Sequence, residues 1–160
     1  MQQIITNKKK NIKIYFEYIV LLIKHPIKTI SPFIVYLSIV DCYNISVFDL
    51  ELPYKLKTLG IEKCDLKIFK SKLPETLESL RIFDTDLSIF NSILPNKLGC
   101  LVIKENKLIL FDSLLPIKLN TFYISCNNIK KLKLNKMTRS YEYDDIKNKK
   151  TFHKRKFYKK

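Results

Sequence analysis

The sequence predicts a repeat solenoid, in which short coils of chain stack on one another. Two sets of residues predict it, because both recur every 21 residues. A constant period of about 20–29 residues is typical of stacked repeats, and a unit this short cannot bury its own apolar side chains without neighbours. The two sets are the Leu-Pro pairs that begin at Leu52, Leu73, Leu94 and Leu115, and the phenylalanines Phe48, Phe69, Phe90 and Phe111.

Each unit has a common apolar pattern between these landmarks. Counted from the leucine of the Leu-Pro pair, apolar residues stand at positions 1, 5, 8, 10 and 15, and Cys, Thr or Asn stands at position 13. An earlier copy begins near Ile34 and has one extra residue before Ile45. The sequence therefore predicts about five coils. In the unit that begins at Leu52 the remaining pattern residues are Leu56, Leu59, Ile61, Cys64 and Leu66.

This pattern, L-x-x-L-x-I-x-x-(N/C/T)-x-L, is the consensus of leucine-rich repeats. Positions 8 and 10 are predicted to face inward from a short strand, because side chains alternate along a strand. We expect short parallel strands on the concave face of a leucine-rich repeat solenoid and extended or 3-10 segments on its convex face. Position 13 is expected to satisfy buried backbone groups where the chain leaves the strand.

The convex half of the core is assigned to the phenylalanine column at position 18. Proline then fixes φ in the Leu-Pro pair and turns the chain back toward the next strand. The residues expected beside the phenylalanines in this half of the core are Val47, Ile68, Ile89 and Leu110.

Three regions are predicted along the chain. Residues 1–29 form an N-terminal cap with a basic start, in which Ile12–Ile23 covers the first coil as a strand pair, a helix or a degenerate repeat. Residues 30–136 form the solenoid. Residues 137–160 hold the remnant of a C-terminal cap and a basic tail, and we expect residues 147–160 to be disordered.

The units resemble the short leucine-rich repeats that open with LPxxLxxL. Two groups share this opening: the bacterial type III effectors, and the F-box-linked FNIP repeat proteins of amoebae and giant viruses. The resemblance covers roughly residues 30–135 and implies a protein-binding solenoid. FNIP repeats place Phe-Asn after the strand, where this chain has pairs such as Asp65-Leu66. We expect neither the ubiquitin-ligase domain of the effectors nor an F-box in this chain.

The formal charge of +15 lies mostly on the two flanks of the repeat. Residues 1–30 carry a net charge of +5, residues 31–135 of +3, and residues 136–160 of +7. A polyanionic partner would therefore meet the flanks before the repeat. The longest apolar stretch, Tyr18–Ile23, is shorter than the ~20 residues of a membrane span. We expect an intracellular, cytoplasmic protein, with the nucleus as an alternative because of Lys154-Arg155-Lys156, or a host cell if the source is a virus or an intracellular pathogen.

The concave face is the expected binding site, because extended concave surfaces are what solenoids use for binding. Arg81, Phe83, Val102 and Lys104 fall on adjacent strands and are predicted to form one patch. Aromatic residues and arginine are typical anchors of protein interfaces, although single exposed apolar residues are also common without any function. We therefore predict a monomeric, non-catalytic module that binds an unidentified protein. Its candidate contact residues are Tyr36, Val40, Arg81, Phe83, Val102, Lys104 and Tyr123.

The basic tail supports an alternative function. Eight of the fourteen residues from 147 to 160 are Lys or Arg, with aromatic residues between them. Such a composition suits single-stranded nucleic acid or an anionic surface, and it also suits a tail that only increases solubility. The candidate residues are Lys149, Lys150, Lys154, Arg155, Lys156, Phe157, Lys159 and Lys160.

No motif predicts catalysis, a cofactor or a metal site. Cys42 and Cys64 occupy position 13, where we expect them to be buried, reduced and structural. Cys100 and Cys126 are expected on or beside the concave face, and no CxxC pair is present. His25 and His153 lie in the two flanks without a patterned acid or nucleophile. With only two glycines, Gly60 and Gly99, the chain has no glycine-rich phosphate loop.

Overall fold

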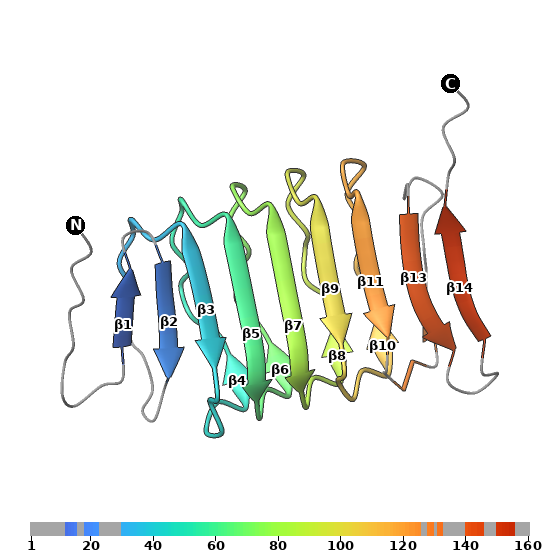
Figure 1. The fold of residues 1–160 in the computed structure, drawn as a ribbon, viewed down its shortest axis with the longest axis horizontal. Coiled ribbons are helices and arrows are strands. Elements are labelled where there is room, and N and C mark those ends of the chain that lie inside the picture. Colours follow the sequence, from blue (N-terminus) through green and yellow to red (C-terminus); the bar gives the residue numbers. More distant parts are fainter. Residues whose placement is uncertain are drawn as a thin grey trace.

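The chain is a β-solenoid of parallel strands with about four turns (Figure 1). This computed structural model describes residues 12–15, 18–22, 30–125, 128–129, 131–132, 140–145 and 150–155, and it describes side chains within 30–125 and 128–129. The described residues form strands, turns and extended segments without a helix. Two sheets share the strands, a nine-stranded broad sheet and a five-stranded narrow sheet. The narrow sheet lies behind the broad sheet in Figure 1.

The broad sheet is parallel from β2 to β13 and ends in an antiparallel hairpin on each side. Neighbouring strands inside the repeat pair at equivalent positions, so that Leu59 lies beside Leu80 and Leu80 beside Leu101. In spatial order the strands are β1 (Ile12–Tyr15), β2 (Tyr18–Leu22), β3 (Tyr36–Val40), β5 (Thr58–Cys64), β7 (Ser79–Thr85), β9 (Cys100–Lys104), β11 (Thr121–Ser125), β13 (Ser140–Asp145) and β14 (Lys150–Arg155).

The narrow sheet consists of two-residue parallel strands, one from each coil. The convex segment of each coil was predicted to be either extended or 3-10. It is extended, and the described residues contain no 3-10 turn. About four turns are present where the repeat predicts about five coils, because the fifth coil is described only in part beyond β11. The strands are β4 (Val47–Phe48), β6 (Ile68–Phe69), β8 (Ile89–Phe90), β10 (Leu110–Phe111) and β12 (Lys131–Leu132).

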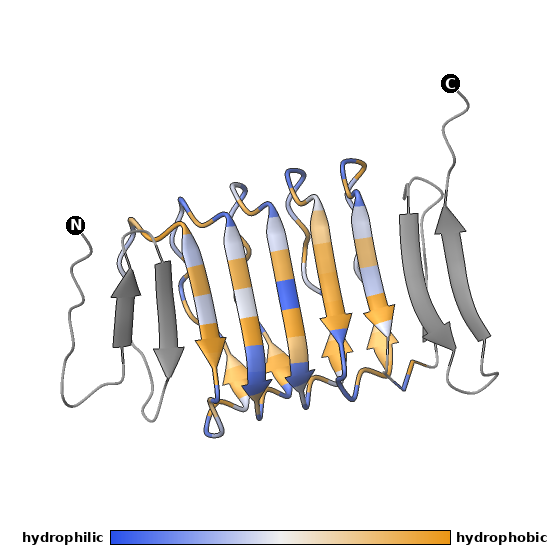
Figure 2. Ribbon diagram, in the orientation of Figure 1, coloured by the Kyte–Doolittle hydropathy of each residue, from blue (hydrophilic) through white to orange (hydrophobic). Residues whose placement is uncertain are grey.

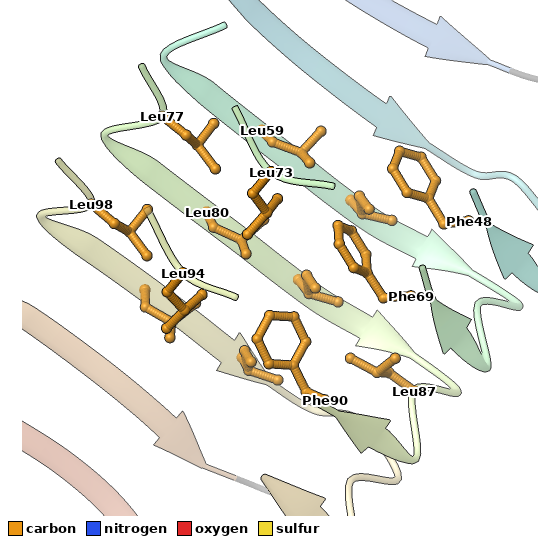
Figure 3. Packing of buried hydrophobic residues seen from close by; sticks show 14 of the residues in the cluster. Phe48, Leu59, Phe69, Leu73, Leu77, Leu80, Leu87, Phe90, Leu94 and Leu98 are labelled. Carbon is orange, nitrogen blue, oxygen red and sulfur yellow. The ribbon is translucent and has the colours of Figure 1, made fainter. Parts of the chain in front are cut away.

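The core lies between the two sheets and is built from columns of equivalent residues. Buried and half-exposed residues alternate along β3, β5, β7 and β9, and Figure 2 shows the matching bands of hydropathy along β5 and β7. The phenylalanines of position 18 stack at ring-centre separations of 5.3 to 5.8 Å. Figure 3 shows three of these rings, Phe48, Phe69 and Phe90, in a row within a core that also holds leucines from neighbouring coils. Phe122 from β11 extends the row, 5.4 Å from Phe111.

The four residues that were expected beside the phenylalanines do not fill the core. Val47, Ile68 and Ile89 are 36%, 46% and 44% exposed, and Leu110 is half-buried. The reason is the alternation of side chains along a strand: in each two-residue strand the phenylalanine faces inward, so its neighbour must face outward. The narrow sheet therefore carries an aliphatic ladder on its outer face.

A tight turn follows each Leu-Pro pair and returns the chain to the broad sheet. The amide of Leu56 donates to the carbonyl of Pro53 at 3.0 Å, and the next three coils repeat this bond at the same length. Proline is thus the first residue of the turn, and the two residues after it form the turn itself, as in Tyr54-Lys55. The first coil has the same turn, with the Ile34 amide 3.3 Å from the Ser31 carbonyl.

Position 13 satisfies the buried backbone groups at the end of the strand, as predicted for asparagine. Asn106 is 6% exposed, and its Nδ2 donates to the carbonyls of Ile82 at 3.1 Å and Lys104 at 2.8 Å. Its Oδ1 accepts from the backbone amide of Thr85 at 3.1 Å and from the hydroxyl of Thr85. One side chain therefore binds three backbone groups from two coils.

The two ends differ from the repeat. Of the three alternatives for Ile12–Ile23, the structure has a strand pair, because β1 and β2 form an antiparallel hairpin and β2 pairs with β3. At the other end, β13 continues the parallel sheet beyond the last repeat, and β14 pairs with it. Lys150–Arg155, within the segment expected to be disordered, form β14, because the free edge of β13 offers backbone hydrogen bonds. Residues 147–149 and 156–160 lie outside the described residues, and the three predicted regions stay predictions.

Replacing the phenylalanine in the middle of the column tests its contribution to the core. Phe90 is 1% exposed, stacks on the ring of Phe111 and makes a tilted contact with the ring of Phe69. We expect Phe90→Ala to lower the free energy of unfolding by about 3–5 kcal/mol, measured by urea denaturation. The control is Ile93→Ala in the same coil, which is 91% exposed and should change it by less than about 0.5 kcal/mol. Equal effects of the two substitutions would contradict the central role of the column.

The hydrogen bonds of Asn106 predict a large cost for a small substitution. Asn106→Ala leaves the buried carbonyl of Ile82 and the amide of Thr85 without this partner. We expect the free energy of unfolding to fall by about 2–4 kcal/mol, measured by thermal or urea denaturation. The matched control is Asn91→Ala, because Asn91 is exposed. If Asn106→Ala were as mild as the control, the hydrogen bonds would contribute little to stability.

Candidate protein-binding face

The outward residues of the broad sheet form three ladders that run across its strands. We name the outer surface of β3, β5, β7, β9 and β11 the ladder face. The middle ladder places Gly60 between Ser38 and Arg81 and continues to Val102 and Tyr123. The ladder nearer the strand starts is Tyr36, Thr58, Ser79, Cys100 and Thr121, and the ladder nearer the strand ends is Val40, Glu62, Phe83, Lys104 and Ser125.

The structure brings four of the predicted contact residues into one cluster. Arg81 pairs in register with Val102, and Phe83 pairs with Lys104 on the same two strands. The ammonium of Lys104 lies 5.5 Å from the centre of the Phe83 ring, within the range of a cation–π contact. It also lies 2.9 Å from the carboxylate of Glu105. The cluster therefore presents a partly neutralised Lys104 beside an exposed Arg81.

The other predicted residues lie on the same face at greater distance. Tyr123 continues the middle ladder beside Val102, whereas Tyr36 and Val40 lie on β3, two strands away from Arg81. One outward position behaves differently from the expectation, because Ser125 is only 1% exposed. The last two residues of β11 are both buried, so the alternation stops where this strand ends.

A shallow hollow of about 600 Å³ adjoins the cluster. Gly60 contributes no side chain to the lining of this hollow, while the other coils place Ser, Arg, Val or Tyr at the same position. A Cβ atom on Gly60 would lie 3.6 Å from Ser38 Oγ and 4.0 Å from the Leu37 carbonyl, which are ordinary contacts. The hollow is lined by Tyr36, Leu37, Ser38, Thr58, Gly60, Ile61, Glu62, Arg81, Phe83 and Val102.

The hollow holds one acidic and one basic side chain. Glu62 is half-buried and Arg81 is exposed. The ion pairs among the described residues join Lys57 to Glu78, Lys104 to Glu105 and Lys107 to Asp86, so neither Glu62 nor Arg81 takes part. The ladder face thus combines apolar surface with the carboxylate of Glu62 and the guanidinium of Arg81. Neither group forms an ion pair within the described part of the chain. Our prediction from the sequence missed Gly60 and Glu62, although a glycine inside a repeated strand is a visible signal.

The cysteines at position 13 are structural in their surroundings. Cys42 and Cys64 are buried and form no disulfide. The Cys64 thiol donates to the Glu62 carbonyl at 3.1 Å. Its hydrogen bond with Cys42, together with burial, raises the pKa of Cys64 well above its ordinary range. Cys100 is half-exposed on the ladder face, and Cys126 lies outside the described residues.

The hydroxyl of Tyr43 contacts an acidic residue just after the end of β3. The carboxylate of Asp41 raises the pKa of Tyr43, whose hydroxyl donates to Asp41 at 3.4 Å.

Within the part of the chain that the structure describes, no group of three His, Cys, Asp or Glu residues is placed to hold a metal ion.

The tail residues are only partly placed. Lys150, Lys154 and Arg155 lie on β14, where Lys154 pairs in register with Tyr141 of β13. The other tail candidates, Lys149, Lys156, Phe157, Lys159 and Lys160, lie outside the described residues. The strand therefore joins part of the tail to the end of the broad sheet.

Comparison with known proteins gives no family for this chain, because no protein-family model and no curated protein matches its sequence. Among the described residues there is also no helix with the length and apolar character that a membrane crossing requires.

The environments of the cysteines predict their order of alkylation. The thiolate is the reactive form, so burial and a raised pKa should protect Cys64. In a Cys126→Ser background, we expect native Cys100 to react with iodoacetamide at least about tenfold faster than Cys42 or Cys64. Mass spectrometry of digested samples measures each rate, and unfolding in urea should remove the difference. Similar native rates at Cys64 and Cys100 would contradict the buried position of Cys64.

Proposed function

We propose that this chain is a leucine-rich repeat protein that acts as a non-catalytic protein-binding module, and that its partner contacts the ladder face. The leucine-rich assignment is supported by the L-x-x-L-x-I-x-x-(N/C/T)-x-L pattern and by Asn106, whose side chain bonds the backbone of two coils. The single observation that carries the proposed function is the cluster of Arg81, Phe83, Val102 and Lys104 beside the hollow over Gly60.

This cluster has the composition of an interface centre. Arginine and aromatic residues often contribute most of the binding energy at protein interfaces. Phe83 and Val102 are half-buried on the outer surface of the sheet, so a partner can cover them without a change of backbone. Arg81 and Lys104 then border the apolar centre with groups that can bind carboxylates. The face can therefore bind a partner specifically, and this binding requires no chemical step.

A non-catalytic role is also supported by the positions of the reactive side chains. Cys42 and Cys64 are part of the core, and a raised pKa keeps the Cys64 thiol protonated near neutral pH. Reduced cysteines are typical of intracellular proteins, and the absence of disulfides at Cys42, Cys64 and Cys100 fits that compartment. We propose an intracellular, cytoplasmic monomer whose partner is a protein, with no cofactor.

Association of the tail with nucleic acid or an anionic surface is the second candidate. It is favoured by the net charge of +7 on residues 136–160 and by the three basic residues on β14. Binding of this kind weakens steeply as salt increases, because it depends on the release of counterions. Contact through the apolar cluster of the ladder face should depend on salt much less.

Substitution of the two apolar residues of the cluster tests the proposed function. We expect Phe83→Asp with Val102→Asp to abolish capture of the partner from a nuclease-treated extract, because both acids would be buried in the interface. The matched control is Ile68→Asp with Ile89→Asp, which places acids at partly exposed apolar positions on the opposite sheet. Circular dichroism and thermal denaturation establish that both variants fold.

A full-length variant with Lys156, Lys159 and Lys160 changed to Gln distinguishes binding through the tail from binding through the ladder face. Retained capture by this variant and by the control, with loss in the ladder-face variant, supports the proposed function. Undiminished capture by the Phe83 and Val102 variant rules out the cluster. Loss of all capture after nuclease treatment, or in the tail variant alone, assigns the binding to the tail.

A further inference from the structure

The ladder face has a shape that indicates which part of a partner it binds. From β3 to β11 there are four strand spacings of about 4.8 Å, or about 19 Å in total. An extended chain of about six residues covers this distance. The hollow over Gly60 lies near one end of this track, and Tyr123 lies at the other end. A linear segment that crosses the strands would therefore contact every member of the middle ladder.

The hollow has room for a bulky apolar side chain together with part of the segment that carries it. Its floor is the backbone at Gly60, with the aliphatic residues Leu37 and Ile61 below. Tyr36 lines it on the β3 side, and Phe83 lines it on the β7 side. The hollow lies along the surface of the sheet, with lining residues from the four adjacent strands β3, β5, β7 and β9. A side chain that projects from a longer segment fits this shape.

The charges of the face indicate an acidic segment. Arg81 is the exposed ladder residue next to Gly60, and it forms no ion pair within the described part of the chain. Its guanidinium can bind a carboxylate through two parallel hydrogen bonds. The net charge of residues 31–135 is +3, so the solenoid that carries this face does not repel an acidic segment. Glu62 at the rim disfavours a second carboxylate directly over the hollow. The carboxylate of the partner segment is therefore expected beside Arg81.

The spacing of an extended chain then relates the two side chains. Residues i and i+2 project from the same side of an extended segment and lie about 6.7 Å apart. One strand spacing of about 4.8 Å separates Gly60 from Arg81, and the long arginine side chain covers the difference. We infer that the ladder face binds an extended acidic segment of a partner protein, with a bulky apolar side chain over Gly60 and a carboxylate two residues away on Arg81. This inference rests on the proposed function and adds the chemistry of the partner.

The test uses a displayed library of random 12-residue peptides and the full-length chain. We expect selection to enrich an apolar residue and an Asp or Glu separated by one residue. A selected peptide should bind Gly60→Leu at least about tenfold more weakly, because the new side chain occupies the hollow. Gly60 does not have a left-handed φ and has ordinary space around its Cβ position, so this variant should fold with an unchanged melting temperature.

Charge exchange provides the decisive arm. Arg81→Glu should bind the selected acidic peptides about tenfold or more weakly than the native chain. It should regain binding when the acidic residue of the peptide is changed to Lys. Lys118→Glu is the matched control, because Lys118 is an exposed cation in a turn outside the ladder face, and it should leave binding within about twofold. Rescue of Arg81→Glu by the lysine peptide is not expected from a merely structural effect.

Two outcomes would overturn the inference. One is the absence of any enriched peptide on the native chain. The other is enrichment of peptides whose affinity is unchanged in Gly60→Leu and Arg81→Glu. If such peptides or the protein partner are nevertheless lost in the Phe83 and Val102 variant, the proposed function stands and only the identity of the bound segment is wrong. If that variant also binds normally, both proposals fail.

Discussion

The stacking of each coil on its neighbour at one constant register is the constraint on which the rest of the structure depends. It places every side chain beside its own equivalent from the next coil, so a column must consist of residues that pack well against copies of themselves. Leucine and phenylalanine meet this condition, as the 5.3 to 5.8 Å separations of the phenylalanine rings show. Like charges in one column would repel each other. The ion pairs Lys57–Glu78 and Asp86–Lys107 each join equivalent positions of adjacent coils, so opposite charges meet at these two places on the surface.

The same constraint explains how a regular scaffold can hold a specific site. Inward columns hold apolar residues apart from the buried serines Ser71 and Ser113, and position 13 holds groups that satisfy the backbone. The outward ladders have no such restriction, and the middle ladder contains Ser38, Gly60, Arg81 and Val102 in four successive coils. A break in one ladder changes the surface without disturbing the core, because Gly60 lies between the buried Leu59 and Ile61. Specificity can therefore change from coil to coil while the fold stays the same.

The period of the sequence predicts the features that every coil shares, and it predicts less where coils differ. The broad-sheet strands, the buried columns, the outward positions of Arg81 and Phe83, and the role of Asn106 all follow from position in the repeat. The exposure of Ile68 and Ile89 does not, because periodicity alone does not show that the segment around each phenylalanine is a strand with an outward side. The hollow over Gly60 depends on residues of four neighbouring strands. The terminal hairpins lie outside the repeat, so their pairing depends on the free edges of the sheet.

The ends of the broad sheet give the basic tail a structural explanation beside the functional one. A parallel solenoid leaves one unpaired strand at each end, and an exposed edge can pair with another chain. The antiparallel hairpins β1–β2 and β13–β14 extend the sheet but leave a new edge on β1 and on β14. Lysine on an edge strand opposes such pairing, and Lys13 on β1 and Lys150 and Lys154 on β14 are of this kind. Part of the charge of the tail is therefore accounted for without nucleic acid, whereas an edge role does not account for Arg81 and Phe83, which lie in the middle of the sheet.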